Sequence, residues 1–234
     1  LNSIEPMTNI LGLPFLFNNV AHMRDAMDGA PGQQVLRSLE PHGLIGLCFY
    51  DSGARSFYNT KRPIRTPEDM AGMKLRVQNS DLYVSLIQEL GSNPTPMSLG
   101  EVYQSLLQGV IDGAENNWPS YESTGHFEVA GYYSLSQHLI IPECVCINAD
   151  VYNGLSDADK AAVKAAARES AELQRKLWAE RAEASRQMVM KSGVKFNDVA
   201  DKAAFQDAMK PVFEKFLESN QELKPLVAAL QATQ

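Results

Sequence analysis

The sequence predicts an α/β fold, with a mostly parallel sheet and one long helix that spans two lobes. Short apolar runs alternate with amphipathic segments of about ten residues, which is the pattern of βαβ units. Helix-capping residues precede several of these segments, and glycines follow them. One further segment, 156–190, is far longer than an ordinary helix. The 234 residues are enough for one large domain or for two small lobes.

The first fifty residues predict two helices and a strand. Apolar spacing favours helices at 20–27 and 33–40, which end at Gly29 and Pro41. The continuous apolar run 44–50 lies between a glycine and an Asp-Ser-Gly turn, and it predicts a buried strand.

A regular alternation of elements follows. Capping boxes formed by Thr66 with Asp69 and by Ser98 with Glu101 mark two helix starts. Helices are predicted at 66–71, 80–90 and 98–108. Strands or shorter extended segments are predicted at 73–77, 94–97, 110–112 and 139–147. Pro142 favours an edge strand or a crossover for the last of these.

The segment 156–190 predicts a single amphipathic helix. Ser156 and Asp159 form its capping box, and no proline or glycine interrupts it before Gly193. Such a helix would be about 50 Å long, which exceeds one lobe of about 100 residues. It therefore either bridges two lobes or belongs to a coiled coil, and its pattern favours a strut across two lobes. A second helix is predicted at 202–219.

Composition excludes several classes of function. The net charge of −7 argues against a nucleic-acid surface. No apolar run approaches the roughly 18 residues of a membrane span. The four histidines lack the spacing of metal ligands, and no nucleophile elbow, phosphate loop or CxxC motif occurs. We therefore expect no metal and no cofactor. Cys144 and Cys146 would share one face of a strand, and with Cys48 they are expected to be unbridged core residues.

Arg76 is the first candidate for ligand binding. It lies at the end of a predicted strand, just before the helix that starts at Ser80. Ligands of α/β sheets bind outside the carboxyl ends of strands. A guanidinium there matches a carboxylate with two parallel hydrogen bonds, and the helix N-terminus adds positive potential. The alternative is a structural ion pair with an acidic neighbour.

A second group of candidates lies in the loop after the strand predicted at 110–112. Glu115, Asn116 and Asn117 could read hydroxyl groups, as could Gln78 and Asn79 after the neighbouring strand. Trp118 offers a surface for stacking on a sugar ring. The alternatives are an ordinary polar turn and a core tryptophan.

Arg55 is expected on the loop that follows the strand 44–50. There it could bind a second carboxylate group. The alternative is a solvated loop arginine.

Three segments together resemble the DctP-type solute-binding family of TRAP transporters. They are RPIRTPEDMAGMKLRVQNS, NPTPMSLGEVYQSLLQGVIDGAENNW and the long helix that begins LSDADKAAV. The KLRV and DGxEN motifs occur 40 positions apart, counted from Arg76 to Asn116, as in that family. The similarity extends over most of the chain, about 13–211.

The resemblance implies a two-lobed, periplasmic-binding-protein-like fold of type II, with the long helix across both lobes. Lobe 1 would comprise 1–52 and 141–180, and lobe 2 would comprise 53–140 and 181–234. Roughly 70 residues of lobe 1 that the family has before LNSIEP are expected to be missing here, judged by usual domain size. The chain also lacks an initiator methionine and a signal-peptide pattern, so it resembles a processed or cropped form.

The resemblance also implies a function. Arg76 would form the salt bridge to the ligand's carboxylate, assisted by Asn116 and Arg55, with Asn79 and Glu115 lining the cleft. The protein would be a periplasmic, monomeric, non-enzymatic subunit that delivers a small organic acid to TRAP membrane subunits. The segments SGARSFYNTKRPIRTP and GAENNWPSYESTGHFEV are most similar to the branch that binds hexuronates such as glucuronate and galacturonate.

Other interpretations remain open at this point. A C4-dicarboxylate or another sugar acid could be the ligand. An enzyme on the same scaffold would need an acid–base pair, and Glu115 is the only acidic candidate in the presumed cleft. A sensor would need an attached DNA-binding segment, and these residues contain none.

Overall fold

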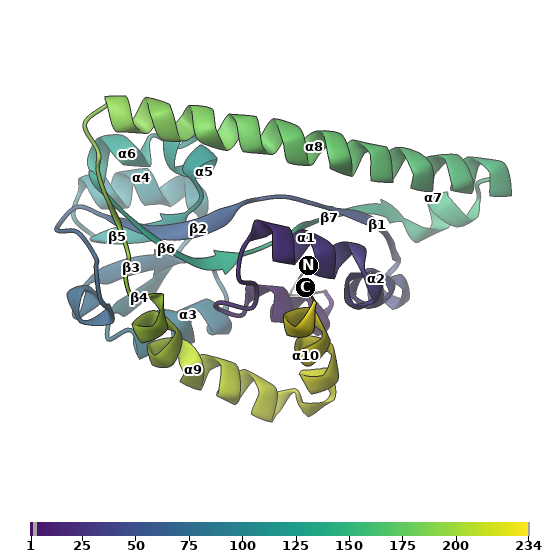
Figure 1. Ribbon diagram of the computed structural model, residues 1–234, viewed down its shortest axis with the longest axis horizontal. Helices are drawn as coiled ribbons and strands as arrows, with labels where there is room; N and C mark the ends of the chain where they lie inside the picture. The colour runs from purple at the N-terminus through teal and green to yellow at the C-terminus, as the bar shows by residue number, and fades with distance from the viewer. Residues whose placement is uncertain (2–3, 234) are drawn as a thin grey trace.

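The computed structural model describes residue 1 and residues 4–233 of the chain. A six-stranded mixed sheet forms the centre of the described part (Figure 1). Its strands lie side by side in the order β4 (Asn93–Pro96), β3 (Lys74–Val77), β5 (Gly113–Asn116), β2 (Ala54–Asn59), β6 (Tyr132–Ile140) and β8 (Lys195–Asp198). A separate antiparallel pair consists of β1 (Leu44–Tyr50) and β7 (Glu143–Asn148).

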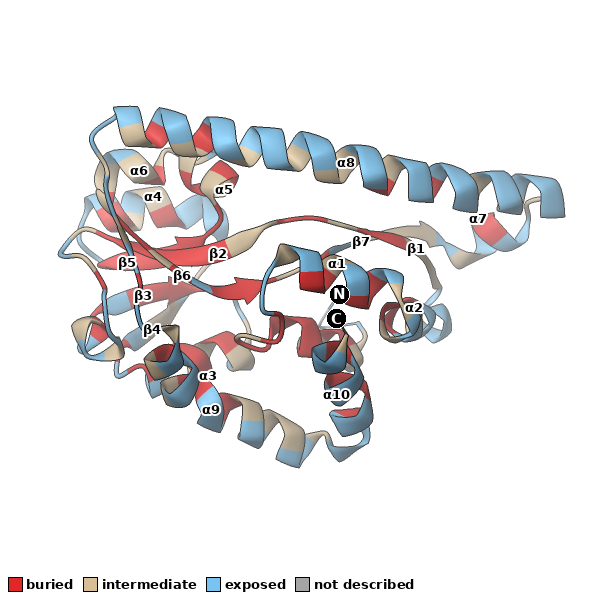
Figure 2. Cartoon of the chain, viewed as in Figure 1, coloured by how far each residue is buried: buried red, intermediate tan, exposed pale blue. Residues whose placement is uncertain are grey.

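Helices pack on both faces of the central sheet, because its strands present apolar side chains to two cores. Phe57 and Leu75 belong to one core, and the neighbouring Tyr58 belongs to the other with Ala114. The first core is covered by α3 (Asp81–Glu89) and α9 (Lys202–Ser219). The second is covered by α4 (Leu99–Leu107), α5 (Trp118–Ser123) and α6 (His126–Val129). Figure 2 shows the inner strands β3, β5, β2 and β6 as mostly buried, whereas the edge strands β4 and β8 are more exposed.

A third group of elements packs beside the sheet. It consists of η1 (Pro6–Gly12), α1 (Val20–Asp28), α2 (Ala30–Arg37) and α10 (Lys224–Ala232). Their apolar side chains form one cluster with Phe49 of β1 and Ile140 of β6. A hydrogen bond of 2.9 Å between His22 Nε2 and the Leu230 carbonyl oxygen joins α1 to α10. Segments from opposite ends of the chain therefore lie side by side. The short elements η2 (Glu40–His42), η3 (Pro67–Met70), α7 (Ala149–Asn153) and η4 (Gln221–Leu223) connect the rest.

The predicted long helix is confirmed as α8 (Asp157–Lys191), with 35 residues. Ala167 and Ala171 pack with Cys48 of β1, and Val189 packs in the core beneath α4 and α5. The helix thus reaches from the β1–β7 pair to the central sheet (Figure 1). Most of its surface is exposed (Figure 2).

The strand predicted at 110–112 is wrong, because the ladder starts one residue later, at Gly113. The backbone N–H groups of Val110 and Ile111 donate to the Ser105 carbonyl oxygen and close the end of α4. They are therefore not available to a sheet. Gly113 begins the strand because a Cβ there would lie 2.3 Å from the Tyr58 carbonyl oxygen. Only glycine allows β5 to approach β2 so closely.

The predicted loop around Arg55 is also wrong, because this segment is the strand β2. It pairs antiparallel with β5 on one side and with β6 on the other. The sheet is mixed through β2 alone, because the other strands of the order all run in one direction, so the predicted mostly parallel sheet is confirmed. Pro142 separates β6 from β7, so the region predicted at 139–147 contains the end of one strand and most of another. The helix predicted at 33–40 begins earlier, as α2, and β8 was not predicted.

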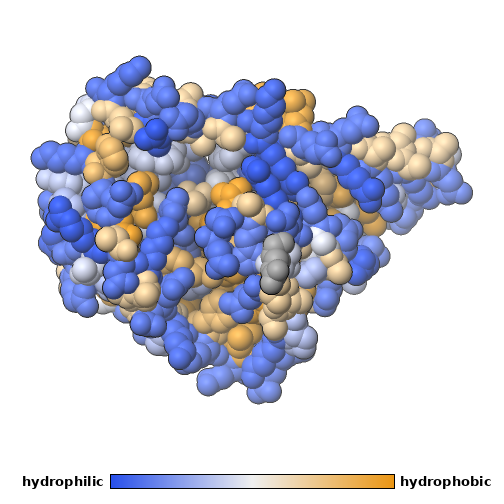
Figure 3. Space-filling view, in the orientation of Figure 1, coloured by the Kyte–Doolittle hydropathy of each residue, from blue (hydrophilic) through white to orange (hydrophobic). Residues whose placement is uncertain are grey.

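The surface is mixed in character. Figure 3 shows hydrophilic side chains over most of the face in view, with apolar patches between them. Within the described residues, no helix combines the length and the apolar character that a membrane crossing requires.

Candidate functional site

Arg76 lies one residue before the carboxyl end of β3, which runs parallel to β4 and β5. Leu75 and Val77 point into the core beneath α3, so Arg76 leaves the strand on the opposite face. Its side chain is buried, with a residue exposure of 5%. Nε donates to the Met97 carbonyl oxygen at 3.0 Å.

The two terminal nitrogens of Arg76 make no hydrogen bond or ion pair with any described residue. The structural ion pair considered as the alternative for Arg76 is therefore not formed within that part of the chain. Burial lowers the pKa of Arg76, and the negative charge of Glu115 opposes this effect. The side chain is a buried cation that lacks a direct anionic partner within the described part of the chain.

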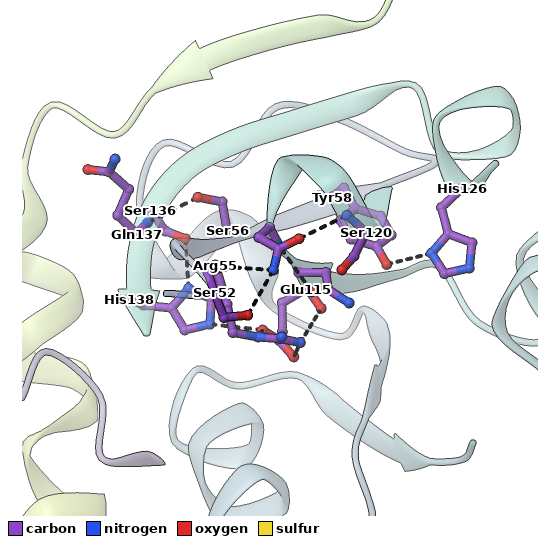
Figure 4. A network of polar contacts seen from close by, with 12 residues as sticks. Ser52, Arg55, Ser56, Tyr58, Glu115, Ser120, His126, Ser136, Gln137 and His138 are labelled. Atoms are coloured by element: carbon purple, nitrogen blue, oxygen red, sulfur yellow. Dashed lines mark hydrogen bonds and ion pairs between the residues drawn. The ribbon is translucent and has the colours of Figure 1, made fainter. Parts of the chain in front are cut away.

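Arg55 and Glu115 form a buried ion pair across the antiparallel strands β2 and β5 (Figure 4). Arg55 Nε donates to Glu115 Oε2 at 2.6 Å, and an Nη nitrogen donates to Oε1 at 2.9 Å. Burial acts to lower the pKa of Arg55, but the paired carboxylate outweighs it and raises this pKa. Arg55 is thus not a solvated loop residue: its Nε and one terminal nitrogen are engaged with Glu115, whereas the other terminal nitrogen makes no hydrogen bond with a described residue.

Two histidines flank this charged group. His138 is fully buried and stacks on Phe57 at a centroid distance of 4.0 Å. Its Nε2 lies 4.0 Å from Glu115 Oε2 and lacks a hydrogen-bond partner among the described residues. Burial, followed by the charge of Arg55, lowers the pKa of His138 to about 3. Burial and the charge of Arg76 lower the pKa of His126 to about 4, and its Nδ1 bonds the Tyr58 hydroxyl. Both rings are neutral near pH 7.

Asn116 ends β5 beside Arg76, so the two motifs that lie 40 positions apart in sequence meet at adjacent strand ends. The Asn116 side-chain oxygen accepts from the backbone of Asn117 at 2.9 Å. Its amino group has no hydrogen-bond partner among the described residues. This group can therefore donate to a ligand.

Asn117 and Trp118 have partners inside the fold. The Asn117 side-chain oxygen caps α5 by accepting from Ser120, and its amino group donates to the Ser52 carbonyl oxygen at 2.8 Å. Trp118 stacks on Tyr133 at a centroid distance of 3.9 Å. Both residues therefore have contacts that hold them inside the fold.

A cavity of about 340 Å³ opens next to these strand ends. Of the predicted residues it includes Arg55, Gln78 and Asn79, whereas Arg76 and Asn116 lie outside its lining. Its opposite wall comes from η1, β1 and the start of β7. Sequence reasoning missed Tyr83, which lines the cavity from α3. A tyrosine on the apolar stripe of a helix is typical of a core residue, so the sequence carries no signal for a role at the cavity.

The described residues contain no cluster of three or more side chains that could hold a metal ion. The three cysteines are unbridged, as predicted, although Cys144 and Cys146 are half-buried at the edge of the core. The strand ends thus provide hydrogen-bond donors and a cation without a direct anionic partner among the described residues, next to a cavity, and this combination suits the binding of an anionic polar molecule.

Comparison with known proteins gives the family. Residues 1–220 match the family described as bacterial extracellular solute-binding protein, family 7 (DctP). The chain belongs to this family. Its members are solute-binding proteins, which agrees with the expectation that the chain is not an enzyme.

Relatives of this DctP-family chain include a solute-binding protein of Chromohalobacter salexigens, 50% identical over 234 residues, which cover 100% of this chain and 70% of that protein. A TRAP periplasmic solute-binding protein of Roseobacter denitrificans, solved with bound β-D-glucuronate, is 55% identical with a TM-score of 0.96. The match covers 100% of this chain and 77% of that one. A counterpart from a Sulfitobacter species, solved with β-D-galacturonate, is 53% identical with a TM-score of 0.95 and coverages of 98% and 77%. These matches confirm the predicted α/β fold.

Proposed function

We propose that the chain is the solute-binding subunit of a TRAP transporter and captures a hexuronate, whose carboxylate Arg76 holds. The observation that carries this proposal is the buried guanidinium of Arg76, whose terminal nitrogens have no partner among the described residues. A planar fork of donors matches a carboxylate. The solved relatives with bound glucuronate and galacturonate support the choice of ligand.

The charge balance favours a ligand with one carboxylate. Arg55 and Glu115 cancel each other in a bidentate pair. Arg76 then leaves a single positive charge among these three residues, and one carboxylate neutralises it. A dicarboxylate would bring a second negative charge close to Glu115, and an unpaired buried charge is costly. A hexuronate instead offers hydroxyl groups to Gln78, Asn79 and the amino group of Asn116.

The partners and the location follow from the same proposal. A TRAP solute-binding subunit delivers its ligand to membrane subunits from the periplasm, and we infer both for this chain. We also infer that it acts as a monomer, with its cleft between the two lobes assigned from the sequence. The family's extracellular designation and the periplasmic relatives support the location.

The proposal is tested by titrating glucuronate, galacturonate, succinate and malate into the full chain by calorimetry. We expect a hexuronate to bind most tightly. Arg76→Ala should weaken its binding by two to four decades, because losing the partner of a buried carboxylate costs about 3–5 kcal/mol. Arg76→Lys should also bind poorly, because an ammonium is a point charge and not a fork.

Two results would contradict the proposal in different ways. Wild-type affinity in Arg76→Ala would refute the assignment of the carboxylate site. Tighter binding of succinate or malate would replace the hexuronate with a C4-dicarboxylate and would leave the family assignment unchanged. A melting temperature of the free Arg76→Ala protein that is no lower than that of the wild type shows that the fold is intact in either case.

A further inference from the structure

Tyr83 combines a fixed ring with a free hydroxyl group at the cavity. It is the third residue of α3, and its residue exposure is 6%. The ring packs in the core with Phe57 and Leu86. The residue also lines the cavity, together with Arg55, Gln78 and Asn79. The core therefore holds the ring in place while part of the side chain faces the cavity.

The hydroxyl of Tyr83 has no hydrogen-bond partner among the described residues, in contrast to the tyrosines of the neighbouring core. Tyr58 bonds His126, Tyr121 donates to the Ala130 carbonyl oxygen, and Tyr133 donates to that of Asn116. Buried polar groups are almost always hydrogen-bonded. An unpartnered hydroxyl on a cavity wall is consequently available to a group that enters the cavity.

The hydroxyl is also kept neutral. Burial, followed by the negative charge of Glu115, raises the pKa of Tyr83 to about 12. It can therefore both donate and accept a hydrogen bond near pH 7, as a hydroxyl of a sugar requires.

Gly12 fixes the position of this hydroxyl from the other side. A Cβ at Gly12 would lie 2.9 Å from the Tyr83 hydroxyl oxygen and 3.2 Å from Leu82 Cδ2. A larger residue at position 12 would therefore push the Tyr83 side chain aside. Gly12 and Tyr83 both line the cavity.

We propose that Tyr83 is a ligand-binding residue whose hydroxyl hydrogen-bonds a hydroxyl group of the bound sugar acid, with Gly12 holding the space for it. The proposal rests on the proposed function and extends it, because it assigns a residue that recognises the sugar part of the ligand and not its carboxylate. Glucuronate and galacturonate differ only in the configuration of one ring hydroxyl, so such a contact can also discriminate between them.

The test is calorimetric titration of glucuronate and galacturonate into the full chain and into Tyr83→Phe. This substitution removes the hydroxyl and keeps the packed ring. Losing one neutral hydrogen bond should weaken binding of at least one of the two sugar acids about tenfold. The melting temperature of the free protein should not change, because the hydroxyl has no partner in the described fold.

Tyr121→Phe is the matched control, because the Tyr121 hydroxyl bonds the backbone in a core remote from the cavity lining. It should lower the melting temperature and leave the affinity unchanged. Gly12→Ala is a second variant, which displaces the Tyr83 hydroxyl without removing it and should also weaken binding.

Wild-type affinity of Tyr83→Phe for both sugar acids would overturn the inference and leave the proposed function in place. So would a lowered melting temperature without a change in affinity, since that is the effect of a purely structural hydroxyl. A wild-type chain that binds neither sugar acid would overturn the proposed function, and this inference with it.

Discussion

Burying a guanidinium is costly unless an anion compensates its charge. At the residue scale, the charges of the two candidate arginines are compensated differently. Glu115 compensates Arg55 with two short hydrogen bonds. Arg76 donates to the Met97 carbonyl oxygen and interacts with the charge of Glu115 only through space. A bound carboxylate would supply the missing compensation, so Arg76 should gain more from the ligand than Arg55 does.

His138 makes the stability of the protein sensitive to acid. Its pKa is about 3 in the fold and about 6.5 in an unfolded chain. Between these values the unfolded state binds one more proton, so stability is lost as the pH falls from about 6.5 towards 3. His138→Gln should make this decline shallower by up to about 1.4 kcal/mol per pH unit. Urea unfolding of both proteins at several pH values measures this slope of unfolding free energy against pH.

His126→Gln serves as a comparison for this prediction. The pKa of His126 is also lowered, to about 4. Removing this ring should therefore flatten the loss of stability over a narrower pH range, which ends near pH 4. An unchanged pH dependence in His138→Gln would show that this ring is not neutral in the native protein.

The sequence identified Arg76 as a candidate because it ends a predicted strand and Asn116 because it follows another, and the structure places them at adjacent strand ends. It could not identify the pairing of Arg55 with Glu115. These residues are 60 positions apart and meet only through the antiparallel strands β2 and β5. Tyr83 was missed because a tyrosine on an apolar helix stripe looks like any core residue.

At the scale of elements, the close approach of β5 to β2 determines where Glu115 lies. Gly113 opens β5, and its pairing with Asn59 sets the register in which Glu115 faces Phe57. The sequence located α3, α4 and α8, because capping residues and glycines mark their ends, but α5, α6, α7 and α10 were not predicted. It missed β2 because Arg55, Ser56 and Asn59 are polar residues that become buried only through tertiary partners.

Gly113→Ala should destabilise the fold by about 1–3 kcal/mol, because the added Cβ would lie 2.3 Å from the Tyr58 carbonyl oxygen and 2.8 Å from Asn59 Cβ. Gly100→Ala is the matched control. Gly100 lies in the first turn of α4, and nothing lies within 4 Å of its Cβ position. It should be neutral or stabilising by about 0.5–1 kcal/mol. Urea unfolding compares the two variants, and equal stabilities would contradict the close approach.

At the scale of the whole molecule, α8 is the element that connects distant parts of the fold. Its first half packs on β1 and its second half on α5 and the core beneath it (Figure 1). The backbone N–H of Asp51 and its carbonyl oxygen both bond the side chain of Gln174 on α8, at 2.9 Å each. The connection between β1 and β2 is therefore hydrogen-bonded to the middle of the helix.

We predict that the two lobes assigned from the sequence close around the ligand. The cavity is walled by β2, by the segment that follows β3 and by α3 on one side, and by η1, β1 and β7 on the other. A ligand between these walls can contact both only when they approach each other, and that differential contact drives closure. Small-angle scattering on the full chain should then give a smaller radius of gyration with glucuronate or galacturonate than without. Arg76→Ala is the control, because at the same ligand concentration it should remain in the open state. Equal radii for the free protein and the saturated protein, with binding verified by calorimetry, would show that the cavity is preformed and that no closure accompanies capture.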